Sequence, residues 1–454
     1  MTTDERRSWV GTAVVVGIAA ILRLVRLDQP RGQIFDEVYY AVDARHLLQH
    51  GVEWDDATGT GAFVVHPPLG KWLIAVGEWL FGYREWGWRI APAVAGILAV
   101  LIVTRLARRL FHSTVLGCAA GLLMALDGLQ LVLSRVALLD IFLLLFVLAA
   151  FACLVRDRDG RAGRPPWTVP WWRLAAAVMA GCALAVKWSA VWYLLGFVVL
   201  IVGWQAGARR SAGVARPWRT ALREERVWVA LSGLTVVAVY LASWTGWFAT
   251  GAGWDRHWLA TQGRTEQPVL GALLNLWHYH REALHFHDTL SVPHRYQSWP
   301  WQWLLLDRPV LFQWSCPDPC TVTSNTSEVL LLGTPLLWWS FLPALAGLVW
   351  LGVRLRDWRA WAIGCGVLAG IVPWFPFELS HRTMFYSYVA PAEPFLILAV
   401  VYVLGALPRA RVLWAGGYVL AVALTFAYFY PVYVSETLSY SQWWARMWLG
   451  ARWY

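Results

Sequence analysis

Two adjacent carboxylates, Asp36 and Glu37, follow the first long apolar stretch of the chain, in the sequence Ile34-Phe35-Asp36-Glu37-Val38. A carboxylate with an ordinary pKa of about 4 is ionised at neutral pH and can accept a proton from an attacking hydroxyl. The structural alternative is that Asp36 caps the free N–H groups of a helix that begins there. The residues alone leave both interpretations open.

Basic residues occur near the ends of several other apolar stretches, where a charge is costly and calls for a partner. The chain has only two lysines, Lys71 and Lys187, and Lys71 ends the sequence His66-Pro67-Pro68-Leu69-Gly70-Lys71. Three arginines are placed in this way, namely Arg89, Arg135 and Arg382, and one carboxylate, Asp140, lies near them in the same kind of position. A phosphate leaving group needs such cations and no strong general acid. One carboxylate base and several cations therefore suit attack by a hydroxyl on a sugar carried by a lipid phosphate.

Each of these residues also has a structural interpretation. Lys71 could be a snorkelling anchor at the membrane surface, and Arg89 could bind lipid head groups. Asp140 could simply pair with Arg135 or Lys187. The prolines at 67 and 68 could begin an interfacial helix, whose first N–H groups would then face an anion.

The elements that would position these residues are membrane-spanning helices. Of the 454 residues, 58% are hydrophobic and only 15% are charged, and a helix crosses a bilayer with about 20 apolar residues. We predict eleven spans, near residues 9–26, 88–108, 114–132, 137–155, 172–186, 188–205, 228–249, 334–353, 359–376, 385–406 and 411–430. The first span is interpreted as a retained helix and not as a cleaved signal peptide.

The arginines indicate the orientation of the spans. They cluster in alternate short loops: Arg6 and Arg7; Arg105, Arg108 and Arg109; Arg156, Arg158, Arg161 and Arg164; Arg209, Arg210, Arg216, Arg219, Arg223 and Arg226; Arg354, Arg356 and Arg359; Arg409 and Arg411. This is the positive-inside pattern, so we expect a cytoplasmic N-terminus. The same distribution accounts for the net charge of +10 and argues against nucleic acid as a partner.

Two long segments and the tail are then predicted outside. The first runs from about residue 28 to 87, with amphipathic stretches at 37–50 and 66–82 joined by a turn at 51–61. The second runs from about 250 to 333, and the tail covers 431–454. We expect residues 1–454 to form a single transmembrane catalytic domain. A transporter would favour inverted repeats, which we do not find.

Cys316 and Cys320 flank the sequence Pro317-Asp318-Pro319 in the second outer segment. Disulfides persist on the oxidising side of a membrane, so we predict that these residues are joined, with two free thiols as the alternative. No spacing of cysteines and histidines predicts a zinc site. The acidic residues leave a divalent metal ion open, and no cofactor is predicted.

Taken together, the motifs resemble those of the dolichyl-phosphate-mannose–protein mannosyltransferases, especially their actinobacterial members. The resemblance covers nearly the whole chain and rests on motifs in the family's order: Phe35-Asp36-Glu37, His66 to Lys71, Arg89, Ser134 to Asp140, Lys187-Trp188, His278 to Arg308, His381 to Phe385, and Pro391 to Phe395. One departure is that the second outer segment is too short for the soluble β-rich module of eukaryotic members.

The resemblance implies an all-α GT-C glycosyltransferase fold and inverting transfer of mannose from a polyprenyl phosphate to Ser or Thr of proteins being exported. It implies that Asp36 is the base and that Glu37 supports substrate positioning. Arg89, Lys187 and Arg382 would bind near the phosphate, with His66, Lys71, Arg135 and Asp140 in the same donor site. The location implied is the cell membrane, with an extracytoplasmic site. A GT-C enzyme with a glycan or lipid acceptor, or a transporter, remains an alternative.

Overall fold

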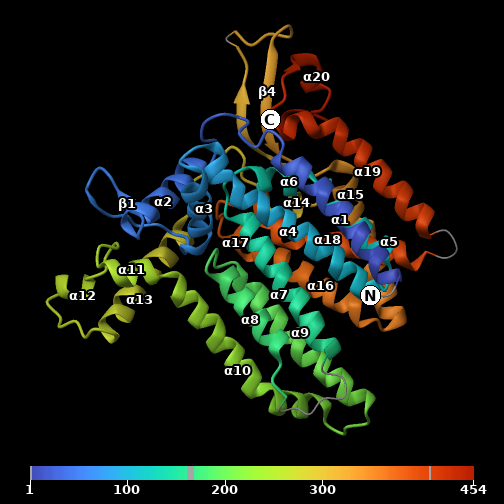
Figure 1. Cartoon of the computed structure of the whole chain (residues 1–454), viewed down its shortest axis with the longest axis horizontal. Helices are drawn as coiled ribbons and strands as arrows, with labels where there is room; N and C mark the ends of the chain where they lie inside the picture. Colours follow the sequence, from blue (N-terminus) through green and yellow to red (C-terminus); the bar gives the residue numbers. More distant parts are fainter. Residues whose placement is uncertain (1–2, 161–167, 318, 408–410) are drawn as a thin grey trace.

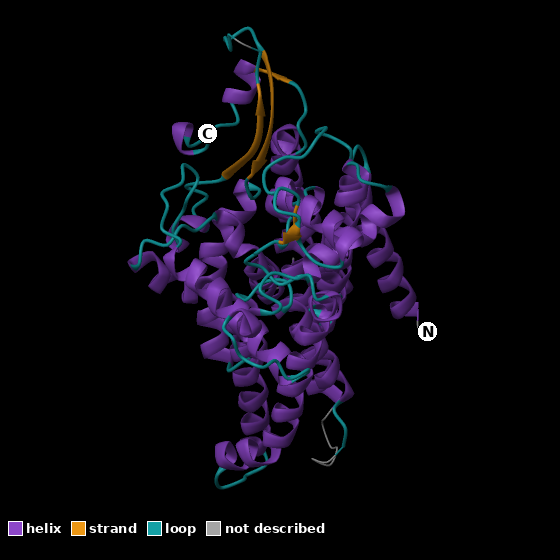
Figure 2. Ribbon diagram, turned by 90° about the vertical axis from the view of Figure 1, so that its left-hand side faces the viewer, coloured by secondary structure: helices purple, strands orange, loops and turns teal. Residues whose placement is uncertain are grey.

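The computed structural model describes residues 3–160, 168–317, 319–407 and 411–454. Arg161, Arg164 and Arg409, which were predicted to lie on the cytoplasmic side, and Asp318 lie outside these ranges. The described chain is a bundle of long helices with a β-hairpin standing at one end (Figures 1 and 2).

Helices occur at all eleven predicted positions. They are α1 (Thr3–Leu24), α4 (Glu85–Phe111), α5 (Thr114–Ala125) with α6 (Gly128–Arg135), α7 (Asp140–Gly160), α8 (Trp171–Leu184), α9 (Ala190–Ser211), α10 (Pro217–Ser243), α15 (Pro335–Leu355), α16 (Trp358–Ile371), α18 (Glu393–Ala406) and α19 (Arg411–Tyr433).

Fewer of these helices meet the requirements for a membrane span. In the described ranges, eight helices are long and apolar enough to cross a membrane, or nine if α5 and α6 form one span bent by 60°. The prediction of about eleven therefore exceeds what length and composition support. The reasons are local, since α8 has only 14 residues and α7 ends in the charged sequence Arg156-Asp157-Arg158-Asp159.

The bend between α5 and α6 is held by Asp127, whose side chain accepts a hydrogen bond from the Gln130 N–H at 3.4 Å. The other carboxylate oxygen accepts from the Thr334 N–H and from Trp338 Nε1, both at 2.8 Å. This buried carboxylate therefore ties the bend to the start of α15. It also sets the direction of α6, which ends at Arg135 and leads to α7.

The first outer segment folds largely as predicted. The helix α2 (Glu37–His50) has the predicted bounds, and α3 (Leu69–Phe81) lies within the second amphipathic stretch. The predicted turn is a small antiparallel hairpin of β1 (Trp54–Asp55) and β2 (Thr60–Gly61). Gly51 ends α2 in a left-handed conformation, with a φ of 77° that suits glycine.

The predicted second outer segment, together with the residues just before it, contains helices and a hairpin. The helices are α11 (Thr245–Thr250), α12 (Trp258–Thr261), α13 (Leu270–Thr289) and α14 (Pro300–Trp303). The hairpin consists of β3 (Val310–Ser315) and β4 (Asn325–Leu331). Cys316 and Cys320, which follow β3 and precede β4 in the chain, are joined by a disulfide.

The C-terminal tail packs on that hairpin. Its strand β5 (Leu438–Ser439) pairs with β4, and α20 (Tyr440–Trp444) follows it. Arg452 Nη1 lies 2.7 Å from Asp307 Oδ1, and Trp453 Nε1 donates to the Leu306 carbonyl at 2.7 Å. The tail thus holds the hairpin against the bundle.

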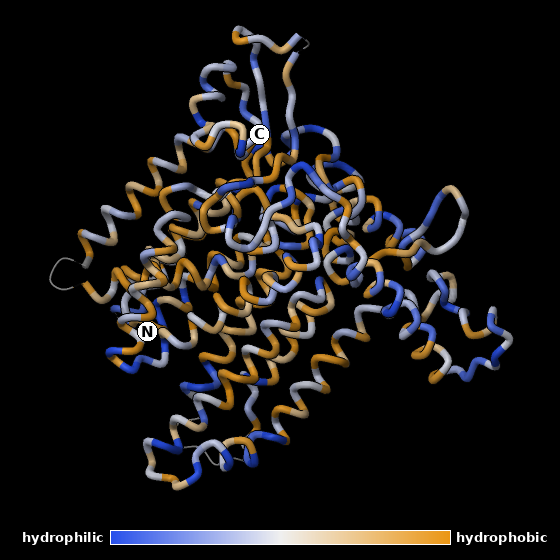
Figure 3. Tube along the Cα trace, turned by 180° about the vertical axis from the view of Figure 1, so that it is seen from behind, coloured by the Kyte–Doolittle hydropathy of each residue, from blue (hydrophilic) through white to orange (hydrophobic). Residues whose placement is uncertain are grey.

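The main core lies where α4, α6, α7 and α18 meet, and the described part of α18 is buried from Glu393 to Tyr402. The helix α10 differs from these core helices, because only 6% of the apolar stretch that could span the membrane is buried within the protein. Along the bundle, hydrophobic residues follow the helices and hydrophilic ones gather at their ends and in the loops (Figure 3).

Candidate functional site

Asp36 lies at the junction between the first span and α2. It occupies the N-cap position of α2, but its side chain makes no capping hydrogen bond, so the structural alternative for this residue is not observed. The preceding residue, Phe35, has a φ of 49°, which is rare for a bulky side chain and characteristic of functional turns. The Phe35 ring stacks on Phe312 of β3 at a centroid distance of 4.2 Å. The Asp36 carboxylate lines a cavity of about 620 Å³.

Glu37 points the other way, into the protein, where it pairs with Arg89. Both side chains are fully buried, with Arg89 Nε 2.8 Å from Glu37 Oε1 and Arg89 Nη2 2.8 Å from Oε2. The N–H groups of Ile34 and Ala137 donate to the same carboxylate at 3.0 Å. This pair therefore fixes the turn that presents Asp36.

Arg89 has no free surface for a phosphate. Besides Glu37, its guanidinium donates to the carbonyl oxygens of Leu27, Pro30 and Gly32 at 2.7–3.3 Å. Arg89 lines neither cavity, and its predicted contact with phosphate stays a prediction. Its partners are the carbonyls of the loop between α1 and α2 and the Glu37 carboxylate.

Arg135 also lies outside the cavity. It donates to the carbonyl oxygens of Leu22, Arg23, Val25 and Arg26 at 2.7–3.1 Å, so it satisfies the free carbonyls at the end of α1. Arg135 lines neither cavity, and its predicted place in the donor site stays a prediction.

Lys187 and Asp140 meet at the cavity. Lys187 lies between α8 and α9, Asp140 begins α7, and Lys187 Nζ is 2.8 Å from Asp140 Oδ2. The sequence left Arg135 and Lys187 as possible partners of Asp140, and in the structure its partner is Lys187. Both residues line the cavity of Asp36 and a second cavity of about 260 Å³ that adjoins it.

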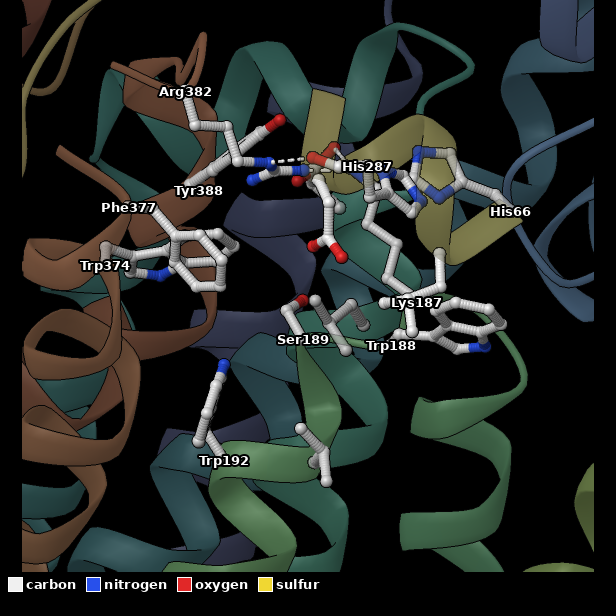
Figure 4. A pocket seen from close by; sticks show the side chains of 15 residues that line it. His66, Lys187, Trp188, Ser189, Trp192, His287, Trp374, Phe377, Arg382 and Tyr388 are labelled. Carbon is white, nitrogen blue, oxygen red and sulfur yellow. Dashed lines mark hydrogen bonds and ion pairs between the residues drawn. The ribbon is translucent and has the colours of Figure 1, made fainter. Parts of the chain in front are cut away.

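The second cavity is shown in Figure 4, with Lys187, His66 and Trp188 on one side and Arg382 and Tyr388 on the other. The His66 ring lies 5.4 Å from the ring of His287 on α13. Arg382 Nε donates to the His287 carbonyl at 3.0 Å, which holds the guanidinium at the cavity wall. The predicted residues His66, Lys187 and Arg382 are thus brought together from three distant parts of the chain.

Lys71 borders the larger cavity from α3 and is fully buried. Its ammonium group contacts the Glu53 carboxylate and lies 3.7 Å from Asp43 Oδ2. It is therefore neither a snorkelling anchor nor an isolated phosphate ligand. Lys71, Asp43 and Glu53 form a network of charges, of which Lys71 and Asp43 line the cavity.

The cavity residues that were not predicted from the sequence include His287, Tyr388 and Tyr40. The signal for His287 was the unusual run of histidines at 278, 280, 285 and 287. In the described ranges, no group of three His, Cys, Asp or Glu side chains is arranged to hold a metal ion. The charged residues that line the two cavities are Asp36, Asp43, Lys71, Asp140, Lys187, Asp288 and Arg382.

The ionisation of the cavity residues follows from burial. Burial raises the pKa of Asp36 to about 6, while Lys187 opposes the shift and Asp140 adds to it. Burial lowers the pKa of His66 well below its usual value, as Lys187 does to a smaller extent. Burial likewise lowers the pKa of His287. At neutral pH Asp36 is therefore ionised, and both histidines are neutral.

A reaction that needs ionised Asp36 should depend on pH accordingly. We expect kcat/KM to fall about tenfold per pH unit below pH 6 and to level off above pH 7, because only the deprotonated carboxylate accepts a proton. Asp140→Asn should move this acidic limb to lower pH, because it removes a charge that raises the pKa of Asp36, and Lys187→Ala should move it to higher pH. The measurement is a pH–rate profile of each protein. If the acidic limb lies at the same pH in the wild type, Asp140→Asn and Lys187→Ala, then Asp140 and Lys187 do not shift the pKa of Asp36 as described.

The chain was then compared with known proteins. Residues 13–252 match the family described as dolichyl-phosphate-mannose-protein mannosyltransferase, and residues 272–453 match the C-terminal four-transmembrane region of protein-O-mannosyltransferase. The chain is 39% identical to the polyprenol-phosphate-mannose–protein mannosyltransferase of Mycolicibacterium smegmatis, over 98% of this chain and 93% of that protein. It is 36% identical to the Mycobacterium tuberculosis protein of the same name, over 98% and 92%.

Solved structures share the fold. The Saccharomyces cerevisiae protein O-mannosyltransferase Pmt1–Pmt2 complex bound to the sugar donor has a TM-score of 0.73 at 14% identity, covering 95% of this chain and 90% of that one. ArnT from Cupriavidus metallidurans bound to undecaprenyl phosphate has a TM-score of 0.56 at 19% identity, covering 93% and 70%. The predicted GT-C fold is therefore confirmed. From its sequence matches, this chain is a multi-pass glycosyltransferase that belongs to the dolichyl-phosphate-mannose–protein mannosyltransferase family.

Proposed function

We propose that the chain transfers mannose from a polyprenyl phosphate mannose to Ser or Thr hydroxyls of proteins, with inversion at the sugar carbon. The observation that carries the proposal is the Asp36 carboxylate, which makes no capping hydrogen bond to α2 and lines the same cavity as Lys187. The relatives that match almost the whole chain are named for this donor and for protein acceptors.

The proposed reaction is a single displacement. The acceptor hydroxyl gives its proton to Asp36 while its oxygen attacks the anomeric carbon of mannose. The bond from that carbon to the phosphate oxygen breaks on the opposite face, and the phosphate keeps the electron pair. Lys187 and Arg382 then stabilise the charge on the leaving phosphate, as fixed cations do in a site from which water is excluded.

The smaller cavity supports a lipid carrier for that phosphate. Beside Lys187 and Arg382 its wall is apolar and aromatic, with Trp188, Trp192 and Trp374 among its lining residues. A prenyl chain could therefore leave the phosphate along this wall toward the membrane. ArnT, which shares the fold, was solved with undecaprenyl phosphate.

We further propose that the cavities face the extracytoplasmic side of the cell membrane. The support is the position of the arginine clusters, because Arg105 to Arg109 end α4, whereas Arg89, next to the Asp36 turn, lies near its beginning. Cytoplasmic arginines place the other ends of these helices outside. Acceptors on exported proteins would meet the site there.

The transfer assay tests this function. Purified chain is incubated with polyprenyl phosphate carrying labelled mannose, and with a Ser/Thr-containing peptide, the same peptide with alanines, or an oligosaccharide. Label in the first peptide alone supports the proposal. Label in the oligosaccharide alone would identify a GT-C enzyme with a glycan acceptor, and unchanged donor in all three would contradict transfer. A parallel set with a chelator tests dependence on a divalent ion.

The proposed phosphate contacts predict a specific defect. Lys187→Ala or Arg382→Ala should lower kcat/KM for the lipid donor by about 10²–10³-fold, because each removes a fixed cation from a desolvated site. The KM for the peptide should change much less. Steady-state kinetics with each substrate varied in turn measures both effects.

Arg31→Ala is the control, because Arg31 is an exposed cation of the predicted first outer segment and does not line either cavity. Normal donor kinetics in both cavity variants would remove Lys187 and Arg382 from the phosphate site.

A further inference from the structure

A cavity of about 770 Å³ lies at the opposite end of the helices that carry the catalytic cavity. On α4, Arg105 is about 24 Å along the helix axis from Arg89, and on α7, Arg156 is about 24 Å from Asp140, at about 1.5 Å per residue. The described N-terminal end of α1, which Figure 1 places beside α5, completes the wall with Asp4 and Trp9.

The charge of this cavity is positive. Its lining holds four arginines against two carboxylates, which are Asp4 and Asp159. Each carboxylate already has an arginine partner, since Arg108 Nη2 lies 3.1 Å from Asp4 Oδ2 and Arg109 Nε lies 2.8 Å from Asp159 Oδ2. The other two arginines are therefore left as excess charge.

Arg105 and Arg156 have no carboxylate within 4 Å in the part of the chain that the structure describes. Arg105 Nη1 donates only to hydroxyls, to Ser8 Oγ at 2.8 Å and Thr12 Oγ1 at 3.3 Å. The Arg156 guanidinium lies over the Trp172 ring at 4.2 Å. Both cations line the cavity and keep donors for an external anion.

Below the arginines the cavity becomes apolar. Its lining includes Leu101, Ile102 and Leu106 of α4, and Ala149, Ala152 and Cys153 of α7. The side chains from α7 are small, so they leave a groove between the two helices under the guanidinium groups. A groove of this kind matches a hydrocarbon chain attached to a charged head.

Two tryptophans mark the depth at which the cavity opens. Trp9 and Trp172 are 48% and 44% exposed, respectively, and the Arg105 guanidinium lies over the Trp9 ring at 3.9 Å. Half-exposed tryptophans are typical of the level of the lipid head groups. The arginines are thus held where a lipid phosphate lies, with apolar surface on the membrane side.

The positive-inside pattern accounts for arginines at this end of the bundle, but not for two of them lining a cavity above an apolar groove. Basic pockets between transmembrane helices bind anionic lipid head groups. We propose that this cavity binds the phosphate of an anionic membrane phospholipid through Arg105 and Arg156, with one acyl chain between α4 and α7. The proposal is independent of the reaction at Asp36.

Native mass spectrometry of the full chain released from neutral detergent tests the proposal. The probes are phosphatidylglycerol and phosphatidylcholine with the same acyl chains. We expect wild-type protein to retain phosphatidylglycerol preferentially. The double variant Arg105→Gln/Arg156→Gln should bind it about 10- to 30-fold more weakly, because each arginine near an anionic lipid contributes about one factor of five.

Arg219→Gln/Arg223→Gln is the matched control, because it removes two exposed arginines of the same predicted membrane face outside the cavity. A third variant, Ala149→Leu, keeps every charge and narrows the groove, so it should weaken phosphatidylglycerol binding even if the arginine variant folds poorly. Unfolding temperature in phosphatidylcholine micelles reports the folding of each variant.

Three results would overturn the proposal: equal retention of the two lipids by wild-type protein, equal losses in the cavity and control double variants, or unchanged binding in Ala149→Leu. Millimolar inorganic phosphate separates the two sources of the anion. If it displaces phosphatidylglycerol completely, the site takes a free anion and the lipid assignment is wrong.

Discussion

Asp36→Asn should abolish mannosyl transfer and leave the protein folded. The amide keeps the shape of the carboxylate but cannot accept the acceptor's proton, and a positioned general base typically contributes about 10²–10⁴-fold. Folding should be preserved because the Asp36 side chain makes no capping hydrogen bond to α2. Initial rates at saturating donor and peptide, together with the unfolding temperature, measure the two effects.

Asp28→Asn is the matched control, since Asp28 is a carboxylate of the same outer segment that does not line either catalytic cavity. Its rate should stay near that of the wild type. Turnover by Asp36→Asn within a few-fold of wild type would show that another group takes the proton.

The second large effect concerns stability. Arg89→Ala should lower the free energy of unfolding by about 3–5 kcal/mol, because it leaves an uncompensated buried carboxylate at Glu37. It also removes the donor to three backbone carbonyls of the loop before α2. Denaturant titration followed by tryptophan fluorescence measures the change.

The comparison with Arg382→Ala distinguishes the roles of the two arginines. Arg382 lines the cavity, so its loss should reduce use of the lipid donor with a much smaller change in unfolding. If Arg89→Ala were as stable as wild type and specifically defective in donor binding, Arg89 would contact the phosphate and the positioning role would be wrong.

The sequence was sufficient to predict the helix that begins after Asp36 and the amphipathic stretch that holds α3. The helix at 37–50 has the predicted bounds because its apolar spacing and the glycine after it are both local signals. The count of spans was less successful. Hydropathy identifies an apolar stretch, but it does not show that α8 is too short or that α5 bends at Asp127.

The roles of the cations could not be separated in advance. Arg89 and Lys187 are both single cations beside apolar stretches, yet Arg89 meets Glu37 inside the protein and Lys187 reaches the cavity. That difference depends on the direction of each side chain and on partners many residues away. The same limit applies to His287 of α13 and to Tyr388 of the short 3-10 helix Tyr386–Ala392, which line the same cavity as His66 although they are distant from it in the chain.

The hairpin of β3 and β4 was also missed, although the buried Val310 and Phe312 alternate with the less buried Leu311 and Gln313 as in a half-buried strand. Its strand β4 also pairs with β5, more than a hundred residues further along the chain. Short strands that pair over such a distance carry little local signal.

This pairing has a consequence for biosynthesis. Phe312 of the hairpin supports Phe35 next to Asp36, and residues 438 to 453 hold the hairpin in place. The long helices α15, α16, α18 and α19, among other segments, must be translated between β4 and β5. At about 5–20 residues per second, this takes roughly 5–20 s. During that interval the nascent chain already contains Asp36, but the hairpin that carries Phe312 is not yet held in place. We therefore expect catalytic activity to appear only after residue 453 has left the ribosome.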